Sequence, residues 1–319
     1  MNNLRKIGLS ALAGSLATFS VNAADVSVSG AASITIGDGD TGHSASGNRY
    51  SMGDSLNFAM SGETDGGIGI AVNYEIDGGV LDDYNLSMSG DWGSLNFAGH
   101  GGSSAFGAID DKTPNAYEEA WAVIDDDGSG TTGGAEVING GGGDNMFIYT
   151  SPSMGGAVFS AAYQSHGADA TGSYTDYSLV ITPEGVDGLT IGAAIADQEI
   201  LSATSVDLEE STVFVTYATG SFTLGLQVSE YDHDTATSDT ESVIYGVSYA
   251  VNDDLSLSFN RHDLETDVAT ESDQESTGIS ASWTSGGMTL AGSMNETNNI
   301  AGTATRDSEG YEVTLSFAF

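Results

Sequence analysis

The chain has no cysteine, only three prolines and few basic residues. Six lysines and arginines stand against 46 aspartates and glutamates, which gives a formal net charge of −40. Without thiols, the protein cannot form disulfides, thiolate metal sites or a cysteine nucleophile. The excess of acids repels phosphate backbones, so the sequence excludes a nucleic-acid partner bound through a basic face. No stretch beyond the N-terminus approaches the roughly 20 apolar residues of a transmembrane helix.

The N-terminus has the order of a secretory signal. Arg5 and Lys6 precede an apolar stretch at residues 7–19, and small residues follow up to Ala23 and Ala24. This order of positive charge, apolar core and small residues predicts a signal peptide over residues 1–23, with cleavage after Ala23 or Ala24. Residues 24–319 then form the exported domain.

Beyond the signal, apolar residues recur with a period of two. Val26, Val28, Ile34 and Ile36 alternate with small or polar residues. The same alternation recurs at residues 56–60, 68–76, 255–259 and 311–319. This period predicts strands with one apolar face and one small or polar face.

Short clusters of Gly, Asn, Asp or Pro precede most of these strands. They lie at residues 62–67, 90–94, 151–156, 183–188, 218–221, 252–254 and 285–287. Two strands, one short turn and one longer polar loop therefore form a repeating unit. With the first and last strands, these units predict sixteen strands of about 10 residues, a length that crosses a bilayer at a tilt. The pattern predicts an all-β, 16-stranded antiparallel transmembrane β-barrel. The competing fold is a secreted β-sandwich or repeat protein with acidic loops.

One interval between strands is about twice as long as the others. Residues 99–145 contain no good alternating strand and are rich in acids. We therefore expect a long loop, about residues 100–145, that follows the fifth strand, folds inward and narrows the channel. The candidate acids of this constriction are Asp110, Asp111, Glu118, Glu119, Asp125, Asp126 and Asp127. The competing interpretation is that they are solvated loop residues.

Strand phase suggests which basic residues face these acids. Arg49 and His100 are out of step with their apolar neighbours, and Arg306 shares the phase of Glu312. Arg261 shares the phase of the apolar residues of its strand, so it faces lipid unless it lies above the bilayer. The candidate basic residues of the pore wall are thus Arg49, His100, Arg261 and Arg306. Ion pairing to a surface loop is the competing role for Arg49 and Arg306.

The most specific motif of the sequence is residues 145–163, with Asn145 before alternating apolar residues and a Tyr149-Thr150-Ser151-Pro152 turn. This motif resembles the general porins of Gram-negative bacteria, especially the α-proteobacterial, Rhodobacter-like type. Residues 95–99 resemble the fifth strand of that family. The last strand, with Tyr311, Phe317 and Phe319, resembles the aromatic C-terminal signal that the outer-membrane assembly machinery recognises.

This resemblance implies a location, partners and a function. The protein is expected in the cell outer membrane, as a homotrimer in contact with outer-membrane lipid and lipopolysaccharide. It is expected to pass ions and small polar solutes by diffusion, with the third loop as the constriction. The family usually carries several arginines opposite that loop, whereas this chain has few. A net negative potential therefore predicts a preference for cations.

Two other readings of the sequence remain. Asp125, Asp126 and Asp127 offer oxygen ligands that suit calcium, although no cofactor is required. An acidic secreted or surface calcium-binding β protein, or adhesin, is therefore the alternative function. Residues 53–56 spell the start of an esterase motif, but Glu230 and Phe259 stand where an aspartate should precede the late histidines. We therefore expect no enzymatic activity.

Overall fold

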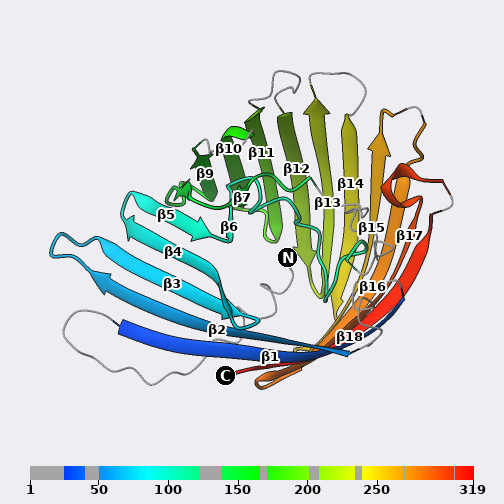
Figure 1. The fold of residues 1–319 in the computed structure, drawn as a ribbon, viewed down its shortest axis with the longest axis horizontal. Coiled ribbons are helices and arrows are strands. Elements are labelled where there is room, and N and C mark those ends of the chain that lie inside the picture. The colour runs from blue at the N-terminus through cyan, green and yellow to red at the C-terminus, as the bar shows by residue number, and fades with distance from the viewer. Residues whose placement is uncertain are drawn as a thin grey trace.

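Sixteen antiparallel strands close into a barrel in the computed structural model, as the sequence predicts. The structure describes residues 25–39, 50–122, 138–165, 171–200, 208–233, 239–268, 270–304 and 306–319. The predicted signal peptide therefore lies outside the described residues. Figure 1 shows the strands as a ring viewed down its shortest axis. No helix in the described ranges is long and apolar enough to span a membrane.

The barrel strands follow one another around the ring in chain order. They are β1 (Asp25–Gly39), β2 (Tyr50–Glu63), β3 (Gly69–Asp77), β4 (Val80–Gly90), β5 (Gly93–His100), β8 (Met146–Thr150), β9 (Ala157–Gln164), β10 (Thr171–Ile181), β11 (Leu189–Ile200), β12 (Leu208–Thr219), β13 (Phe222–His233), β14 (Thr240–Ala250), β15 (Leu255–Thr266), β16 (Gln274–Ser285), β17 (Met288–Asn298) and β18 (Ser308–Ala318). A separate two-stranded sheet joins β6 (Gly102–Ser103) to β7 (Gly142–Gly143), and a 3₁₀ turn, η2 (Ile300–Gly302), follows β17.

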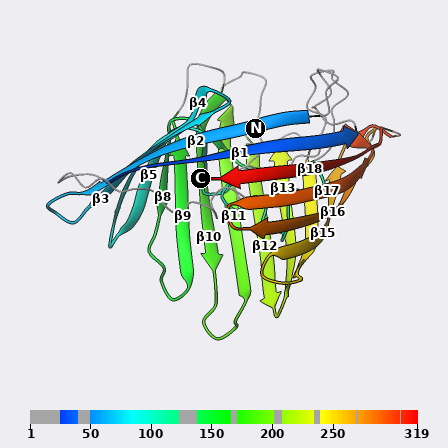
Figure 2. The same cartoon turned by 90° about the horizontal axis from the view of Figure 1, so that it is seen from below.

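The two ends of the chain close the barrel. β1 pairs with both β2 and β18, and Figure 2 shows it between them. The backbone amide of Gly30 donates to the carbonyl of Phe319 at 2.8 Å, and that of Phe319 donates to Gly30 at 3.0 Å. A side chain at position 30 would meet the Phe319 ring at 3.0 Å, so glycine allows the close approach. Tyr311, Phe317 and Phe319 are all partly exposed, and their role in assembly stays a prediction.

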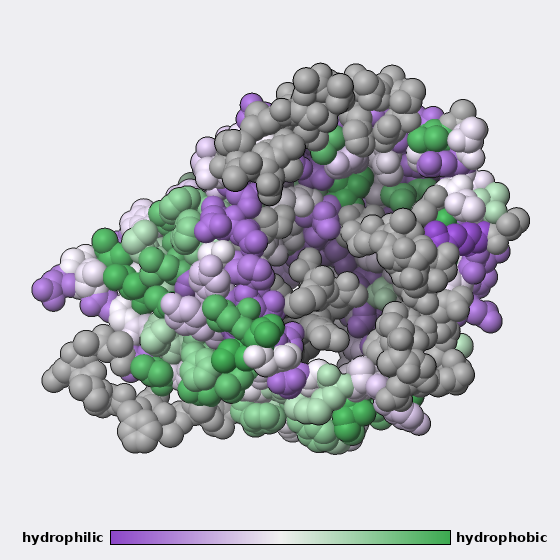
Figure 3. Space-filling model, in the orientation of Figure 1, coloured by the Kyte–Doolittle hydropathy of each residue, from purple (hydrophilic) through white to green (hydrophobic). Residues whose placement is uncertain are grey.

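The two faces of each strand differ as the alternation predicts. Large apolar side chains point outward and are exposed, with Met52 at 72% and Ile195 at 61%. The inner face carries small and polar residues, many of them buried, such as Ser178, Ser242 and Ser280. Figure 3 shows hydrophobic surface along the left and lower margins of one view and hydrophilic residues nearer the centre. An apolar exterior around a polar interior is the pattern of a barrel in lipid.

One connection differs from the predicted alternation of short turns and long loops. β3 and β4 are joined by Gly78 and Gly79 alone, where the sequence pattern predicts a longer polar loop. Both glycines have positive φ, 60° and 80°. Two consecutive residues with positive φ make the tight turn whose twist matches a hairpin, so no longer loop is needed.

Candidate functional site

The described parts of the chain between β5 and β8 lie inside the ring of strands in Figure 1. We call residues 104–121 the lumen segment. Its beginning is fixed by Asp176 on β10, which is fully buried. The Asp176 carboxylate accepts hydrogen bonds from the backbone amides of Ala105, at 3.2 Å, and Phe106, at 2.7 Å. The Tyr174 hydroxyl donates to the same carboxylate at 3.0 Å. Three donors thus compensate the buried charge.

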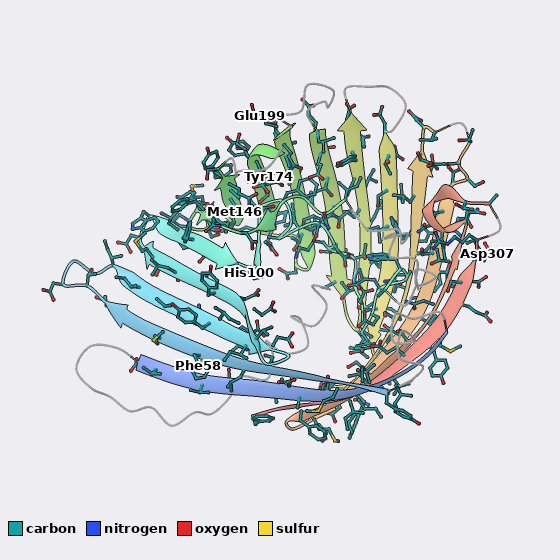
Figure 4. The ribbon with its side chains drawn as sticks, viewed as in Figure 1. Phe58, His100, Met146, Tyr174, Glu199 and Asp307 are labelled. Atoms are coloured by element: carbon teal, nitrogen blue, oxygen red, sulfur yellow. The ribbon has the colours of Figure 1, made fainter. Side chains whose placement is uncertain are left out.

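A small apolar cluster packs around this beginning. Phe106 is fully buried, and Figure 4 labels Met146 and Tyr174 on the adjoining wall. The cluster comprises Ala105, Phe106, Ile109, Ile138, Met146, Ala162, Tyr174, Ala194, Ala196 and Phe214. Small residues on β11 make room for it, because a side chain at Gly192 would lie 2.2 Å from the Phe214 ring. Burial of these apolar groups stabilises the segment against β8–β12.

Gln227 on β13 binds the next part of the segment through both the nitrogen and the oxygen of its side-chain amide. Its Nε2 donates to the carbonyls of Ile109 and Asp110, each at 2.8 Å, and to Thr212 Oγ1 at 2.8 Å. Its Oε1 accepts from the backbone amide of Lys112 at 2.8 Å. Gln227 is fully buried and its amide is fully used, so it fixes the position of residues 109–112.

Two serines on the wall then accept hydrogen bonds from the segment backbone. The amide of Ala116 donates to Ser258 Oγ on β15 at 2.9 Å, and that of Tyr117 donates to Ser280 Oγ on β16 at 3.0 Å. The two serine hydroxyls lie 2.6 Å apart. Both are short side chains, so the segment backbone lies directly on the sheet.

The segment ends on β17 and β18. The Tyr117 hydroxyl donates to Thr314 Oγ1 at 2.7 Å and is also hydrogen-bonded to the Glu312 carboxylate. Asn295 Nδ2 donates to the carbonyl of Glu119 at 2.6 Å. The lumen segment therefore crosses the inner wall from β10 to β18.

Glycines mark where the segment lies closest to the wall. A Cβ at Gly225 on β13 would lie 2.5 Å from Pro114 Cδ. A Cβ at Gly278 on β16 would lie 2.8 Å from Ala120 Cα. Contacts this short are not compatible with a side chain, so both positions need glycine for the observed packing.

Three carboxyl groups of the segment are packed together away from solvent. Burial, and then the neighbouring Asp111, raises the pKa of Asp110 from 3.8 to about 7. Burial and the Asp111 carboxyl raise the pKa of Glu119 from 4.5 to about 10. Burial also raises the pKa of Asp111, although hydrogen bonds from Glu119 and Thr113 oppose that shift. At neutral pH Glu119 is therefore protonated and donates to the Asp111 carboxylate.

The acids predicted to line the constriction therefore differ in burial and in ionisation. Asp110 and Glu119 are buried, at 9% and 3% exposure, and Asp111 is bonded to Glu119. Glu118 is half-buried beside them. Asp125, Asp126 and Asp127 lie outside the described residues. The sequence could not show that part of this charge is removed by protonation, because burial depends on the path of the segment.

Arg261 lies on the outer face of β15. Its inclusion among the pore-wall candidates was therefore wrong. Arg261 pairs in register with Tyr245, an exposed residue of the outer face. Its guanidinium contacts Asp263 at 2.7 Å and Glu275 at 3.1 Å. The reason is the strand phase, which it shares with the exposed Leu257 and Phe259.

Of the other predicted basic residues, His100 and Arg306 lie in different parts of the barrel. A register shift places His100 opposite Tyr84, and the two rings stack at 6.4 Å. Because Tyr84 also stacks on Tyr74 of the outward-facing row, His100 shares that side rather than the inner wall. Arg306 lies in the connection between β17 and β18, where its amide donates to the Thr303 carbonyl. Arg49 lies outside the described residues.

Sequence reasoning missed the wall residues that hold the segment. They are Asp176, Gln227, Ser258, Asn260, Ser280, Asn295, Glu312 and Thr314. Their inward phase was readable, because each is out of step with the outer apolar residues of its strand. That phase does not distinguish a residue bonded to a loop from one that lines open water.

The comparisons with known proteins agree with this arrangement. The family model for Gram-negative porins matches residues 8–316. The chain belongs to the Gram-negative porin family. A comparison with curated proteins found no match.

Solved porin structures have the same fold at low identity. The chain is similar to an anion-selective porin from Comamonas acidovorans, with 19% identity, a TM-score of 0.69, and coverage of 93% of this chain and 100% of that chain. It is similar to OmpT of Vibrio cholerae, with 10% identity, a TM-score of 0.70, and coverage of 95% and 100%. A variant of the Rh. blastica porin gives 15% identity, a TM-score of 0.61, and coverage of 92% and 100%.

Family and fold together establish the general role. This porin is a transmembrane β-barrel of the Gram-negative outer membrane and a diffusion channel. Apart from the β3–β4 turn, its short turns and longer loops lie at opposite ends, and in such barrels the short turns are periplasmic.

Proposed function

We propose that this porin is a general diffusion channel for ions and small hydrophilic solutes, narrowed by the lumen segment and selective for cations. The observation that carries the proposal is the line of hydrogen bonds from Asp176 on β10 to Thr314 on β18. A sixteen-stranded barrel otherwise encloses a wide aqueous channel. A segment bonded across its inner wall reduces that width.

The cation preference rests on the charges of the described residues. The lysines and arginines of the described ranges are Lys112, Arg261 and Arg306, and Arg261 faces outward. Inward-facing carboxylates include Glu75 and Glu312, which hydrogen-bond to Ser55 and Tyr117. A lumen with this balance concentrates cations. The similar Comamonas protein is anion-selective, but at 19% identity the likeness shows the fold alone.

The pKa shifts change which acids carry the selectivity. Glu119 is neutral at pH 7, and Asp110 is about half ionised there, because their pKa values are raised to about 10 and about 7. Glu118 and the wall carboxylates then supply most of the field near the segment.

Assembly and cofactors follow the family pattern in this proposal. The protein forms a homotrimer, contacts lipopolysaccharide, and is inserted by the assembly machinery through Tyr311, Phe317 and Phe319. The Rhodobacter-like subtype rests on residues 145–163. Calcium at Asp125, Asp126 and Asp127 stays an expectation about residues outside the described ranges. The channel needs no catalytic step, and the alternative of a calcium-binding adhesin has no support from the closed barrel or the family match.

Planar-bilayer recording tests this proposal directly. Purified protein is expected to give discrete conductance steps and, in a salt gradient, a reversal potential of the sign for cation preference. Glu118→Gln should reduce that potential, whereas Glu184→Gln, in a turn at the other end of the barrel, should leave it unchanged. Absence of conductance contradicts the channel, and the opposite sign of the potential contradicts the cation preference.

A further inference from the structure

A bulge brings two adjacent aspartates together near the start of β4. The register of β3 and β4 passes from Tyr74 opposite Tyr84 to Ile76 opposite Leu81, so Asp82 and Asp83 both lie opposite Glu75. In a regular strand, neighbouring side chains point to opposite faces. A bulge re-aims one of them, which lets both carboxylates turn to the same place.

A second irregularity turns His100 toward those carboxylates. The register of β4 and β5 passes from Tyr84 opposite His100 to Asn85 opposite Ala98, so Gly99 is the extra residue. A Cβ at Gly99 would lie 2.0 Å from the Tyr84 ring, so glycine is needed for this packing. The His100 ring then stacks on Tyr84, with an interplanar angle of 15°.

The three side chains converge at the spacing of metal ligands. One carboxylate oxygen each from Asp82 and Asp83 and one ring nitrogen of His100 lie within 4.8 Å of one another. His100 Nδ1 lies 3.9 Å from Asp83 Oδ1. Ligand atoms around a tetrahedral zinc ion, each about 2 Å from the metal, lie roughly 3.3 Å apart, so side-chain movements of about 1 Å would bring all three atoms onto one ion.

A fourth residue occupies the other side of the imidazole. Asp144 Oδ1 lies 3.8 Å from His100 Nε2 and accepts a hydrogen bond from the Gly101 amide at 3.4 Å. Metal-bound histidines usually direct their second ring nitrogen at a carboxylate, which orients the ring and makes it a better ligand. Asp144 directly follows β7 and lies two residues before β8, so it belongs to the returning end of the chain that forms the lumen segment.

We propose that Asp82, Asp83 and His100 bind a divalent transition metal ion, with Asp144 as the outer carboxylate. An imidazole combined with carboxylates suits zinc and its neighbours, whereas an all-oxygen site suits calcium. His100 is the last residue of β5, and the side chains of His100 and Asp83 are 48% and 19% exposed, so an ion can reach them at this end of the strand. A bound ion would join β4 to β5 and, through Asp144, to the start of β8.

The test is zinc binding to the refolded, full-length protein in detergent, measured by titration calorimetry. We expect one Zn²⁺ per chain. His100→Ala and the pair Asp82→Asn with Asp83→Asn should each abolish this binding, and Asp144→Asn should weaken it by about 10-fold. Asp253→Asn with Asp254→Asn is the matched control, since it removes two adjacent exposed aspartates from a turn and should leave binding unchanged. Heat-dependent gel migration shows which variants are folded. If His100→Ala does not fold, His100→Gln is measured instead.

Two results overturn the proposal. Zinc binding that survives the His100 variants, or that falls equally in the Asp253 and Asp254 control, indicates adsorption to an acidic surface. Displacement of Zn²⁺ by Ca²⁺ at equal concentration contradicts the choice of a transition metal. These readouts do not depend on conductance, so they are independent of the proposed channel function.

Discussion

The inner walls on the two sides of the barrel use similar residue types for different purposes. On β13–β17, Ser258 and Ser280 accept hydrogen bonds from the backbone of the lumen segment, and Gly278 lies against it. On β2–β4, the polar side chains bond to one another, as Ser55 does to Glu75 at 2.8 Å and Asn73 to Asn85 at 3.1 Å.

This difference shows which wall residues allow a loop to pack against the inside of a barrel. Where the segment backbone lies closest, the covered wall has glycines and serines, and its longer side chains, such as Gln227 and Asn295, bond to the segment. On the open wall, the polar side chains bond to each other in the sheet instead. Substitutions on the covered wall should therefore have larger effects than matched substitutions on the open wall.

The largest expected effect is that of Asp176→Ala. Loss of the carboxylate leaves the buried amides of Ala105 and Phe106 without their acceptor, which costs about 1–3 kcal/mol for each amide. The temperature at which the folded form disappears on gels should fall clearly. Asn73→Ala on the open wall is the control. Its loss of thermal stability should be small, because water reaches that site. Equal shifts for the two variants would contradict the distinction between the walls.

Gly278→Ala should have the next largest effect. The added Cβ would meet Ala120 Cα at 2.8 Å and Asn295 Oδ1 at 2.7 Å, and overpacking of this kind costs about 1–3 kcal/mol. Gly53→Ala on β2 is the matched control, since its Cβ would meet only the hydroxyl of Ser33, which can rotate. We expect lower thermal stability and noisier single-channel current for Gly278→Ala alone. A quiet, stable Gly278→Ala channel would show that the segment does not lie on β16.

The smallest expected effect is a pH dependence of selectivity. The pKa of Asp110 is raised from 3.8 to about 7, so the folded protein retains a proton that the unfolded chain has lost between these values. Stability should therefore fall as the pH increases from about 4 to about 7 and level off above that, whereas cation preference should rise around pH 7 as Asp110 ionises in the folded protein. Reversal potentials measured across this interval should show the rise, and Asp110→Asn should flatten it. An unchanged pH profile in Asp110→Asn would assign the titration to another group.

The sequence predicted the fold better than the site for a physical reason. A closed barrel needs only alternation and regular turns, and both are local properties that residues 26–36 and 311–319 show directly. The path of the lumen segment depends on bonds between distant residues, such as Tyr117 and Thr314. Alternation reveals that Thr314 points inward, but it does not reveal its partner.

Register irregularities account for the other differences. Phase counting placed His100 on the pore wall because it assumes an unbroken strand, whereas the bulge at Gly99 moves His100 to the side of Tyr84. For Arg261, phase counting indicated the outer face, and the structure places it there with Asp263 and Glu275. Strand phase is therefore informative until a bulge resets it.

Cysteine cross-linking tests most directly whether the lumen segment lies on β15 within the channel. The chain has no cysteine, so Ala116→Cys with Ser258→Cys introduces one pair, at positions where the Ala116 amide lies 2.9 Å from Ser258 Oγ. We expect mild oxidation to cross-link this pair completely and to leave single-channel conductance unchanged. Ala116→Cys with Ser55→Cys, on the open wall, should not cross-link. A Ser258 pair that stays reduced, or a Ser55 pair that cross-links as well, would contradict the account.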